Sequence, residues 1–229
     1  MVTEELRRRA DQIWRGILAH PFVAELYSGS LPLEKFRYYL LQDYNYLVNF
    51  AKALSLAAAR APRVELMKAA LELAYGTVTG EMANYEALLR EVGLSLRDAE
   101  AAEPNRVNVS YMAYLKSVCA LDGFYQCMAA LLPCFWSYAE IAEAHKDKLA
   151  GNPVAVYRRW ASVYLSPEYK SLVSRLRGVL DASGIKELFV SHKNFMKNQS
   201  PASNAVLTVL ATAVVYNLQS VRAQNATAL

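Results

Sequence analysis

The sequence predicts an all-α fold, a bundle of long helices. Glycine and proline are scarce, with 9 and 8 copies among 229 residues, while alanine, leucine and tyrosine are abundant. Hydrophobic residues recur with helical spacing along nearly every segment, and no alternating strand of useful length occurs. Because 54% of the residues are hydrophobic and 20% are charged, the chain is able to bury a sizeable core, which argues against a disordered protein.

Proline residues and helix-capping side chains mark where the first helices begin and end. Thr3 is the expected N-cap of the first helix, and Glu4 and Glu5 follow in the positively polarised first turn. Pro21 is expected to end this helix, because proline cannot continue one. Pro32 stands at a favoured first-turn position and starts the second.

The later joints follow the same logic. Gly93 is the expected C-cap of the third helix, and Gly151-Asn152-Pro153 closes the fifth. Ser166 followed by Pro167 predicts a cap and a first-turn proline. We expect helices over roughly residues 3–20, 32–60, 63–91, 105–121 and 123–149, a short one after 153, and further ones over 166–184, 185–197 and 200–220. No linker is long enough to separate domains, so we expect a single helical domain over residues 1–229.

Charge and hydropathy argue against two classes of partner. The net charge is +4, and the run Arg7-Arg8-Arg9 is better explained as a solvated helix face than as a nucleic-acid surface, which needs a broader basic stripe. The longest apolar run, Ala205 to Leu218, has about 14 residues where a membrane span needs about 20. We therefore expect neither a nucleic-acid partner nor a membrane anchor.

The three cysteines and the absence of a signal peptide indicate a reducing cytoplasm. Cys127 and Cys134 share a helix face about 10 Å apart, too far for a disulfide. The three histidines are far apart in sequence, and no metal-ligand or glycine-rich phosphate motif occurs. We expect neither a metal nor a nucleotide site.

Cys134 is the most informative candidate because it directly follows Pro133 inside a predicted helix. An interior proline deletes a backbone hydrogen bond and costs about 3 kcal/mol, so its presence suggests a compensating gain. Tyr138 lies one turn further along the same face. A thiol at a kink beside a phenol indicates a pocket with a nucleophile; the alternative is a cysteine that serves as a small buried hydrophobe.

Asp43, Tyr46 and Phe50 fall on one helical face among apolar and aromatic neighbours. Because an unpaired buried carboxylate is costly, Asp43 either makes an interhelical hydrogen bond that fixes packing or binds the N–H groups of a ligand at the floor of an aromatic pocket.

Tyrosine is unusually frequent, with 15 copies. Tyr111, Tyr138 and Tyr164 lie on separate predicted helices that can converge, although most buried tyrosines are core residues with one bonded hydroxyl. Several aromatic faces and one carboxylate suit a flat heteroaromatic ligand.

Several segments together resemble the TenA/thiaminase II family. The matching pieces, spread over about residues 20–165 in order and without large gaps, are Gln42-Asp43-Tyr44-x-Tyr46-Leu47, Gly80-Glu81 through Gly93, Ser110-Tyr111 with Tyr114-Leu115, and Leu132-Pro133-Cys134-x-Trp136-x-Tyr138 with Glu140. The first and last of these are the most specific. The resemblance implies a helical bundle of the haem-oxygenase-like type, a homotetramer, and no metal or organic cofactor.

The resemblance also implies an activity in thiamin salvage. Members of that family hydrolyse aminopyrimidines such as 4-amino-5-aminomethyl-2-methylpyrimidine to the hydroxymethyl compound, and many cleave thiamin. By resemblance, Cys134 attacks a pyrimidine ring carbon and Asp43 bonds the ring nitrogen and the exocyclic amine. Tyr46, Tyr111, Tyr138 and Tyr164 are then the residues that line the pocket.

One feature of the family pattern is missing. The family has a glutamate near its C-terminus, shortly before a Phe-Trp pair, that serves as acid and base at the ring. No such motif occurs in residues 189–204, where the position falls on Met196 or Ala202, and nearby Asn204 cannot shuttle a proton as a carboxylate does. Glu187 fits no alignment. Two alternatives therefore stay open: a family member that binds a pyrimidine without hydrolysing it, and an enzyme for another heteroaromatic substrate.

Overall fold

The predicted all-α class is confirmed in the computed structural model, which describes residues 1–183 and contains no strand among them. The helices are α1 (Val2–Arg9), α2 (Asp11–Leu18), α3 (Pro21–Ser28), α4 (Leu33–Ala59), α5 (Val64–Gly76), the π-helix η1 (Thr77–Glu81), α6 (Met82–Glu91), α7 (Leu96–Ala101), α8 (Arg106–Leu121), α9 (Phe124–Ala150), α10 (Ala155–Ser162), the 3-10 helix η2 (Val163–Leu165) and α11 (Pro167–Asp181). The helices expected over 185–197 and 200–220 lie outside the described residues. The single domain over 1–229 therefore stays a prediction.

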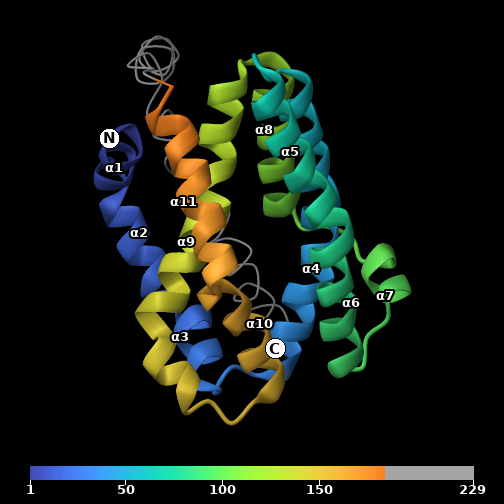
Figure 1. Cartoon of the computed structure of the whole chain (residues 1–229). Coiled ribbons are helices and arrows are strands. Elements are labelled where there is room, and N and C mark those ends of the chain that lie inside the picture. The colour runs from blue at the N-terminus through green and yellow to red at the C-terminus, as the bar shows by residue number, and fades with distance from the viewer. Residues whose placement is uncertain (184–229) are drawn as a thin grey trace.

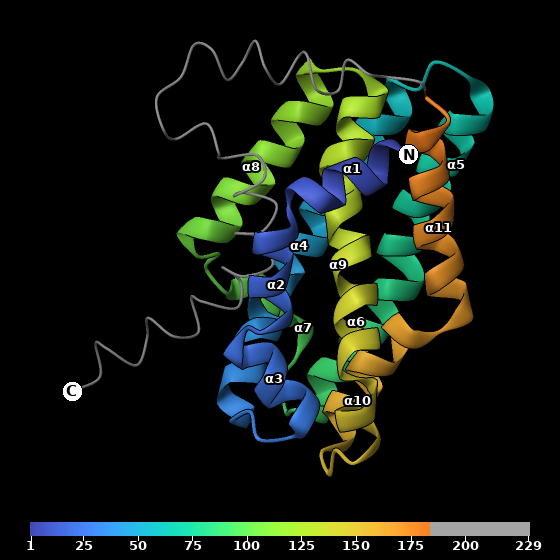
Figure 2. The same cartoon turned by 90° about the vertical axis from the view of Figure 1, so that its left-hand side faces the viewer.

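Helix α9 occupies the centre of this arrangement (Figures 1 and 2). Helices α2, α3, α8, α10 and α11 all pack against it, while the equally long α4 packs on α5, α7 and α8. Helix α1 lies beside the far end of α11, where the Thr3 hydroxyl and amide both donate to the Asp181 carboxylate at 2.9 and 2.8 Å. Segments from the two ends of the described chain are thereby joined.

The expected first helix is wrong in two respects: it is two helices that break at Ala10, and its N-cap is Met1, so Thr3 lies inside α1. The break allows α1 to pack on α11 while α2 packs on α9. Pro21 does end this stretch, but it also begins α3, a helix that the sequence pattern did not predict. The amide of Phe22 donates to Nδ1 of His20, so His20 caps α3 and Pro21 takes the first position, where a missing amide costs nothing.

Other boundaries are confirmed. Ser166 caps α11 by accepting a hydrogen bond from the Tyr169 amide at 3.1 Å, with Pro167 in the first turn. Gly93 follows α6 with a left-handed φ of 73°, as expected of a C-cap glycine. The short α7 was missed, although Ser95 and Asp98 form the capping box that starts it.

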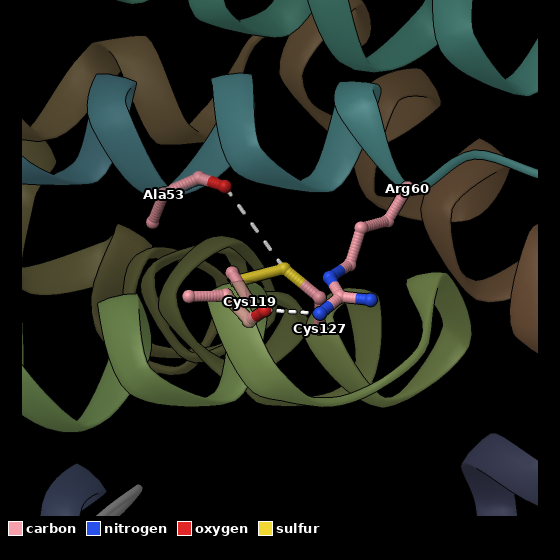
Figure 3. Close-up of a disulfide and its surroundings, with 5 residues drawn as sticks. Ala53, Arg60, Cys119 and Cys127 are labelled. Carbon is pink, nitrogen blue, oxygen red and sulfur yellow. Dashed lines mark hydrogen bonds between the residues drawn. A yellow bond between two sulfur atoms is a disulfide. The ribbon is translucent and has the colours of Figure 1, made fainter.

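A disulfide joins the end of α8 to the start of α9, between Cys119 and Cys127 (Figure 3). Their Cα atoms lie 4.6 Å apart because the chain reverses between the two helices. Ala120 in the same turn accepts a hydrogen bond from the Arg60 guanidinium, which links this corner to the end of α4. This pairing differs from what a reducing cytoplasm favours; Cys134 is a free, buried thiol.

Within residues 1–183, no helix combines the length and apolar character that crossing a membrane requires.

Candidate active site

A cavity of about 940 Å³ is lined by residues of α4, α5, η1, α6, α9, α10, η2 and α11. Its size falls within the range of small-molecule sites. The lining residues able to bind or react are Asp43, Tyr46, Glu81, Cys134, Tyr138, Trp160, Tyr164 and Tyr169. The cavity therefore combines a thiol, two carboxylates and several aromatic side chains.

Helix α4 contributes Asp43, Tyr46 and Phe50, the face that the spacing identified. The neighbouring Gln42 fixes the position of this face. Its side-chain oxygen accepts from the Asn105 amide at 2.8 Å, and its backbone carbonyl accepts from the Asn108 side chain at 2.7 Å. These bonds tie α4 to the start of α8 on the side away from the cavity and leave Asp43 free to face it.

Cys134 lies on α9 directly after Pro133 and is 5% exposed. The Tyr111 hydroxyl of α8 lies 2.5 Å from its Sγ. Burial raises the pKa of the Cys134 thiol to about 11, and the hydroxyls of Tyr111 and Tyr46 oppose that shift by hydrogen bonding. Such a thiol is protonated at neutral pH, so it needs a base or a substrate that accepts its proton before it becomes a nucleophile.

Asp43 and Glu81 form a pair of carboxyl groups on adjacent walls of the cavity. Desolvation raises the pKa of Asp43 to about 8, and the charge of Glu81 adds to this shift. Desolvation raises the pKa of Glu81 to about 7, opposed by the Thr77 hydroxyl. Among the described residues, no hydrogen bond satisfies the Asp43 carboxyl group. Asp43 therefore lines the cavity with a carboxyl group whose raised pKa favours the protonated form at neutral pH.

Aromatic side chains complete the walls. Tyr46 stacks on Phe50 with ring centroids 5.2 Å apart, and its ring is nearly parallel to that of Tyr111 at 6.3 Å. Tyr138 stacks on Tyr164 at 4.8 Å. These flat surfaces suit a flat ring, since stacked π-systems contribute beyond the area they bury.

Hydrogen bonds hold the hydroxyl groups of Tyr138 and Tyr169 in place. The Tyr138 hydroxyl lies 3.2 Å from that of Tyr39, and Tyr169 donates to the Phe135 carbonyl at 3.0 Å. Trp160 of α10 lies edge-on to the Tyr138 ring at 5.9 Å. The structure thus brings five of the six residues chosen from the sequence into the cavity wall, and it places the sixth, Tyr111, behind Cys134 in contact with the sulfur.

The cavity is also lined by Glu81, Trp160, Tyr169 and Tyr39, to which no sequence pattern assigned a role. Glu81 belonged to a segment that carried the family resemblance, but helical periodicity does not reveal the π-helix that presents it. The residues considered for the missing glutamate, Met196, Ala202, Asn204 and Glu187, lie outside the described part of the chain. Within residues 1–183, no group of three or more histidine, cysteine, aspartate or glutamate side chains is arranged to hold a metal ion.

Fold and site together define a class: helical-bundle proteins whose central cavity holds a cysteine, acidic groups and stacked aromatic rings. The chain belongs to the TENA/THI-4/PQQC family, whose model matches residues 7–183. It is 32% identical over 176 residues to an aminopyrimidine aminohydrolase of Halalkalibacterium halodurans, covering 77% of this chain and 79% of that one.

Solved structures agree with this assignment. The TenA homologue from P. horikoshii OT3 is 44% identical, with a TM-score of 0.83 over 97% of each chain. A domain from Shewanella denitrificans OS217, described as having a heme oxygenase-like fold, is 14% identical and superimposes with a TM-score of 0.70 over 98% of this chain and 93% of that one. The second likeness concerns the fold alone, and it confirms the haem-oxygenase-like architecture.

Proposed function

We propose that this protein is a thiaminase II-like hydrolase of thiamin salvage that converts 4-amino-5-aminomethyl-2-methylpyrimidine to the 5-hydroxymethyl compound and ammonia, and that also accepts thiamin. The observation that chiefly supports this proposal is that Cys134, Asp43 and a set of stacked aromatic rings line one cavity. Family membership and the aminohydrolase relative support this choice of substrate.

In this proposal, Asp43 recognises the substrate by hydrogen bonding. A neutral 4-aminopyrimidine presents an acceptor, the ring nitrogen, beside a donor, the exocyclic amine. A protonated carboxyl group presents the complementary pair, an O–H donor and a C=O acceptor. The pKa of about 8 keeps Asp43 in this form at neutral pH. Tyr46, Tyr138 and Tyr164 supply the rings between which the pyrimidine stacks.

The chemistry proceeds by covalent catalysis. The Cys134 sulfur forms a bond to a ring carbon, the ring nitrogen gains a proton as the thiol loses one, and the ring becomes electron-rich. The ring then expels the amine by breaking the exocyclic C–N bond. Water adds to the exocyclic carbon and the thiolate leaves, which restores the aromatic ring. Splitting one difficult substitution in this way is the general advantage of a nucleophilic enzyme.

The test is hydrolysis of the aminomethyl compound by the wild type and by Cys134→Ala. We expect C134A to lose turnover at least a thousandfold while it still binds hydroxymethylpyrimidine in calorimetry. Ser137→Ala is a matched control on the same helix, because the buried Ser137 hydroxyl has no hydrogen-bond partner in the described structure. Unchanged hydrolysis by C134A would overturn the assignment of Cys134 as the nucleophile. Tight binding without turnover by the wild type would instead indicate a binding protein.

We further propose a homotetramer. Val64, Met67, Leu71, Tyr75 and Val78 follow one another at helical spacing along α5 and η1, and they are 37–70% exposed. Monomers rarely expose a continuous apolar row of this kind, which supports an interface on this face. Light scattering on the wild type should give four times the chain mass, and Leu71→Glu should lower it. A monomeric wild type would contradict the proposal.

The cytoplasmic location stays a prediction. The Cys119–Cys127 disulfide is an argument against a strongly reducing compartment, since thiols there are normally kept reduced. Fractionation of native cells, with the redox state of these two cysteines trapped at lysis, would decide the location and the pairing together.

A further inference from the structure

The proposed hydrolysis needs a proton donor, and Asp43, Tyr138 and Cys134 do not supply one. An amine leaves poorly unless it is protonated, and the incoming water must later lose a proton. Asp43 is engaged with the ring edge in the proposed binding mode. Burial raises the pKa of Tyr138 far above neutrality and that of Cys134 to about 11, so both hold their protons too firmly. No glutamate-Phe-Trp motif occurs in residues 189–204.

Glu81 occupies an unusual position in the backbone. It ends the five-residue π-helix Thr77–Glu81, which interrupts the long run of α5 and α6. A π-turn adds one residue to a helical turn and so changes the direction of the side chains beside it, and such turns are frequent at functional sites. Here Glu81 joins Asp43 and Cys134 in the lining of the cavity.

Glu81 interacts electrostatically with groups on four of the other elements that line the cavity. Its charge raises the pKa values of groups on α4, α9, η2 and α11, namely Asp43, Cys134, Tyr138, Tyr164 and Tyr169. These interactions are consistent with the position of Glu81 in the lining of the cavity. Glu81 also has no structural role in a salt bridge, since no basic side chain of the described residues pairs with it.

We infer that Glu81 is the acid and base of the proposed reaction, an inference that rests on the proposed function. Its carboxyl group donates a proton to the departing nitrogen as the exocyclic C–N bond breaks, so the product is ammonia. The resulting carboxylate takes a proton from water as the oxygen bonds to the same carbon. The cycle returns Glu81 to its protonated form, and the nitrogen that gains a proton and the oxygen that loses one are bonded in turn to the same exocyclic carbon.

The pKa of Glu81, about 7, suits this double role. A group that must give and then take a proton works best when its pKa is near the working pH. Asp43 and Glu81 titrate as a coupled pair, so activity should report apparent values of the pair. The other titratable and charged groups that line the cavity with Glu81 are Asp43 on α4, Arg63 just before α5, Glu65 and Glu72 on α5, Tyr85 on α6, Cys134 and Tyr138 on α9, Tyr164 on η2, and Tyr169 and Arg175 on α11.

The experiment compares the wild type with Glu81→Gln in hydrolysis of 4-amino-5-aminomethyl-2-methylpyrimidine. We expect E81Q to lower kcat about a hundredfold or more, the usual contribution of general acid–base catalysis. Binding of hydroxymethylpyrimidine should stay within threefold, and the limb of the pH profile near neutrality should disappear. E81Q should fold, because the Glu81 side chain is exposed and makes no ion pair within the described residues. Glu86→Gln on α6, which removes only an ion pair with Arg90, is the matched control and should keep wild-type activity.

Each outcome has one meaning. An active wild type with E81Q within threefold of it in kcat, or with the neutral limb retained in E81Q, overturns this inference and leaves the proposed function standing. A loss of binding as large as the loss of kcat overturns it as well, because Glu81 is then a binding residue. An inactive wild type overturns the proposed function and the inference together. A selective loss of kcat with the pH limb supports the inference.

Discussion

The Tyr111 hydroxyl and the Cys134 sulfur lie 2.5 Å apart across the contact between α8 and α9. Tyr111 is 5% exposed, so its hydroxyl has little access to water and is available to the sulfur. A phenol that donates to a thiolate stabilises the charged form, and Tyr111 accordingly opposes the rise in the Cys134 pKa caused by burial. Tyr111 therefore influences the reactivity of the thiol from behind the cavity wall.

Tyr111→Phe should raise the pKa of Cys134 further, because it removes a donor without opening a large space. Losing one hydrogen bond of about 0.5–1.5 kcal/mol corresponds to roughly a two- to tenfold slower reaction of the thiol. The measurement is the rate of Cys134 alkylation by iodoacetamide between pH 7 and 9, followed by mass spectrometry. Tyr75→Phe, a change at an exposed tyrosine of α5, is the control. Equal or faster alkylation of Y111F would contradict the prediction.

Tyr46 should contribute to ligand affinity mainly through its ring. Tyr46→Ala removes a flat surface that stacks on Phe50 and should weaken hydroxymethylpyrimidine binding about 10–100-fold, as expected for loss of an aromatic–base stack. Tyr46→Phe keeps the ring and loses only the hydroxyl near Cys134, so its affinity should stay within about threefold of wild type. Calorimetry on both variants gives the comparison. Similar losses of affinity in both variants would show that the hydroxyl of Tyr46, and not its ring, contributes to binding.

A site residue could be predicted from the sequence where a regular helix determines its direction, and could not where an irregular turn does. The Asp43, Tyr46 and Phe50 face follows from the 3.6-residue period of one regular helix, and the structure puts all three in the cavity wall. Glu81 could not be assigned in this way, since the π-helix shifts its direction by an amount that periodicity does not encode.

The disulfide illustrates a second limit. Cys119 and Cys127 are eight residues apart, and their proximity depends on where α8 ends and on how sharply the chain reverses before α9. Spacing along one helix correctly excluded a bond between Cys127 and Cys134, but it gave no information about two helices that meet. Pro21 shows the same limit for boundaries, because one proline both ends α2 and begins α3.

The disulfide should stabilise the fold measurably. Closing a loop of this length restricts the unfolded chain by about 2.5 kcal/mol in the loop-entropy account. The double variant Cys119→Ser/Cys127→Ser should therefore unfold at a lower temperature and a lower denaturant concentration than the wild type. Because both sulfurs are fully buried, reduction of the wild type should need partial unfolding. A prolonged treatment with reductant should lower the stability of the wild type and leave the double variant unchanged; stability of the wild type that is insensitive to reduction would contradict this account.

Asp43 should make the protein less stable as the pH rises. Its pKa is about 8 in the folded protein and near 3.8 in the unfolded chain, so between these values the folded state binds more protons. The free energy of unfolding then falls as the pH rises through this window, and the effect is complete only above the folded pKa. Glu81, with a pKa of about 7, adds a change of the same sign.

Asp43→Asn should remove the Asp43 part of this dependence. At pH 8.5 we expect D43N to be more stable than the wild type by about 2 kcal/mol, less than the full shift implies because water in the cavity screens the charge. At pH 3, below both pKa values, the two proteins should have nearly equal stability. Urea unfolding at several pH values measures the difference, with the exposed Asp147→Asn as control. If D43N were no more stable than the wild type at pH 8.5, Asp43 would have to be ionised at neutral pH. A charged acceptor would then replace the neutral donor–acceptor pair in the recognition of the pyrimidine edge.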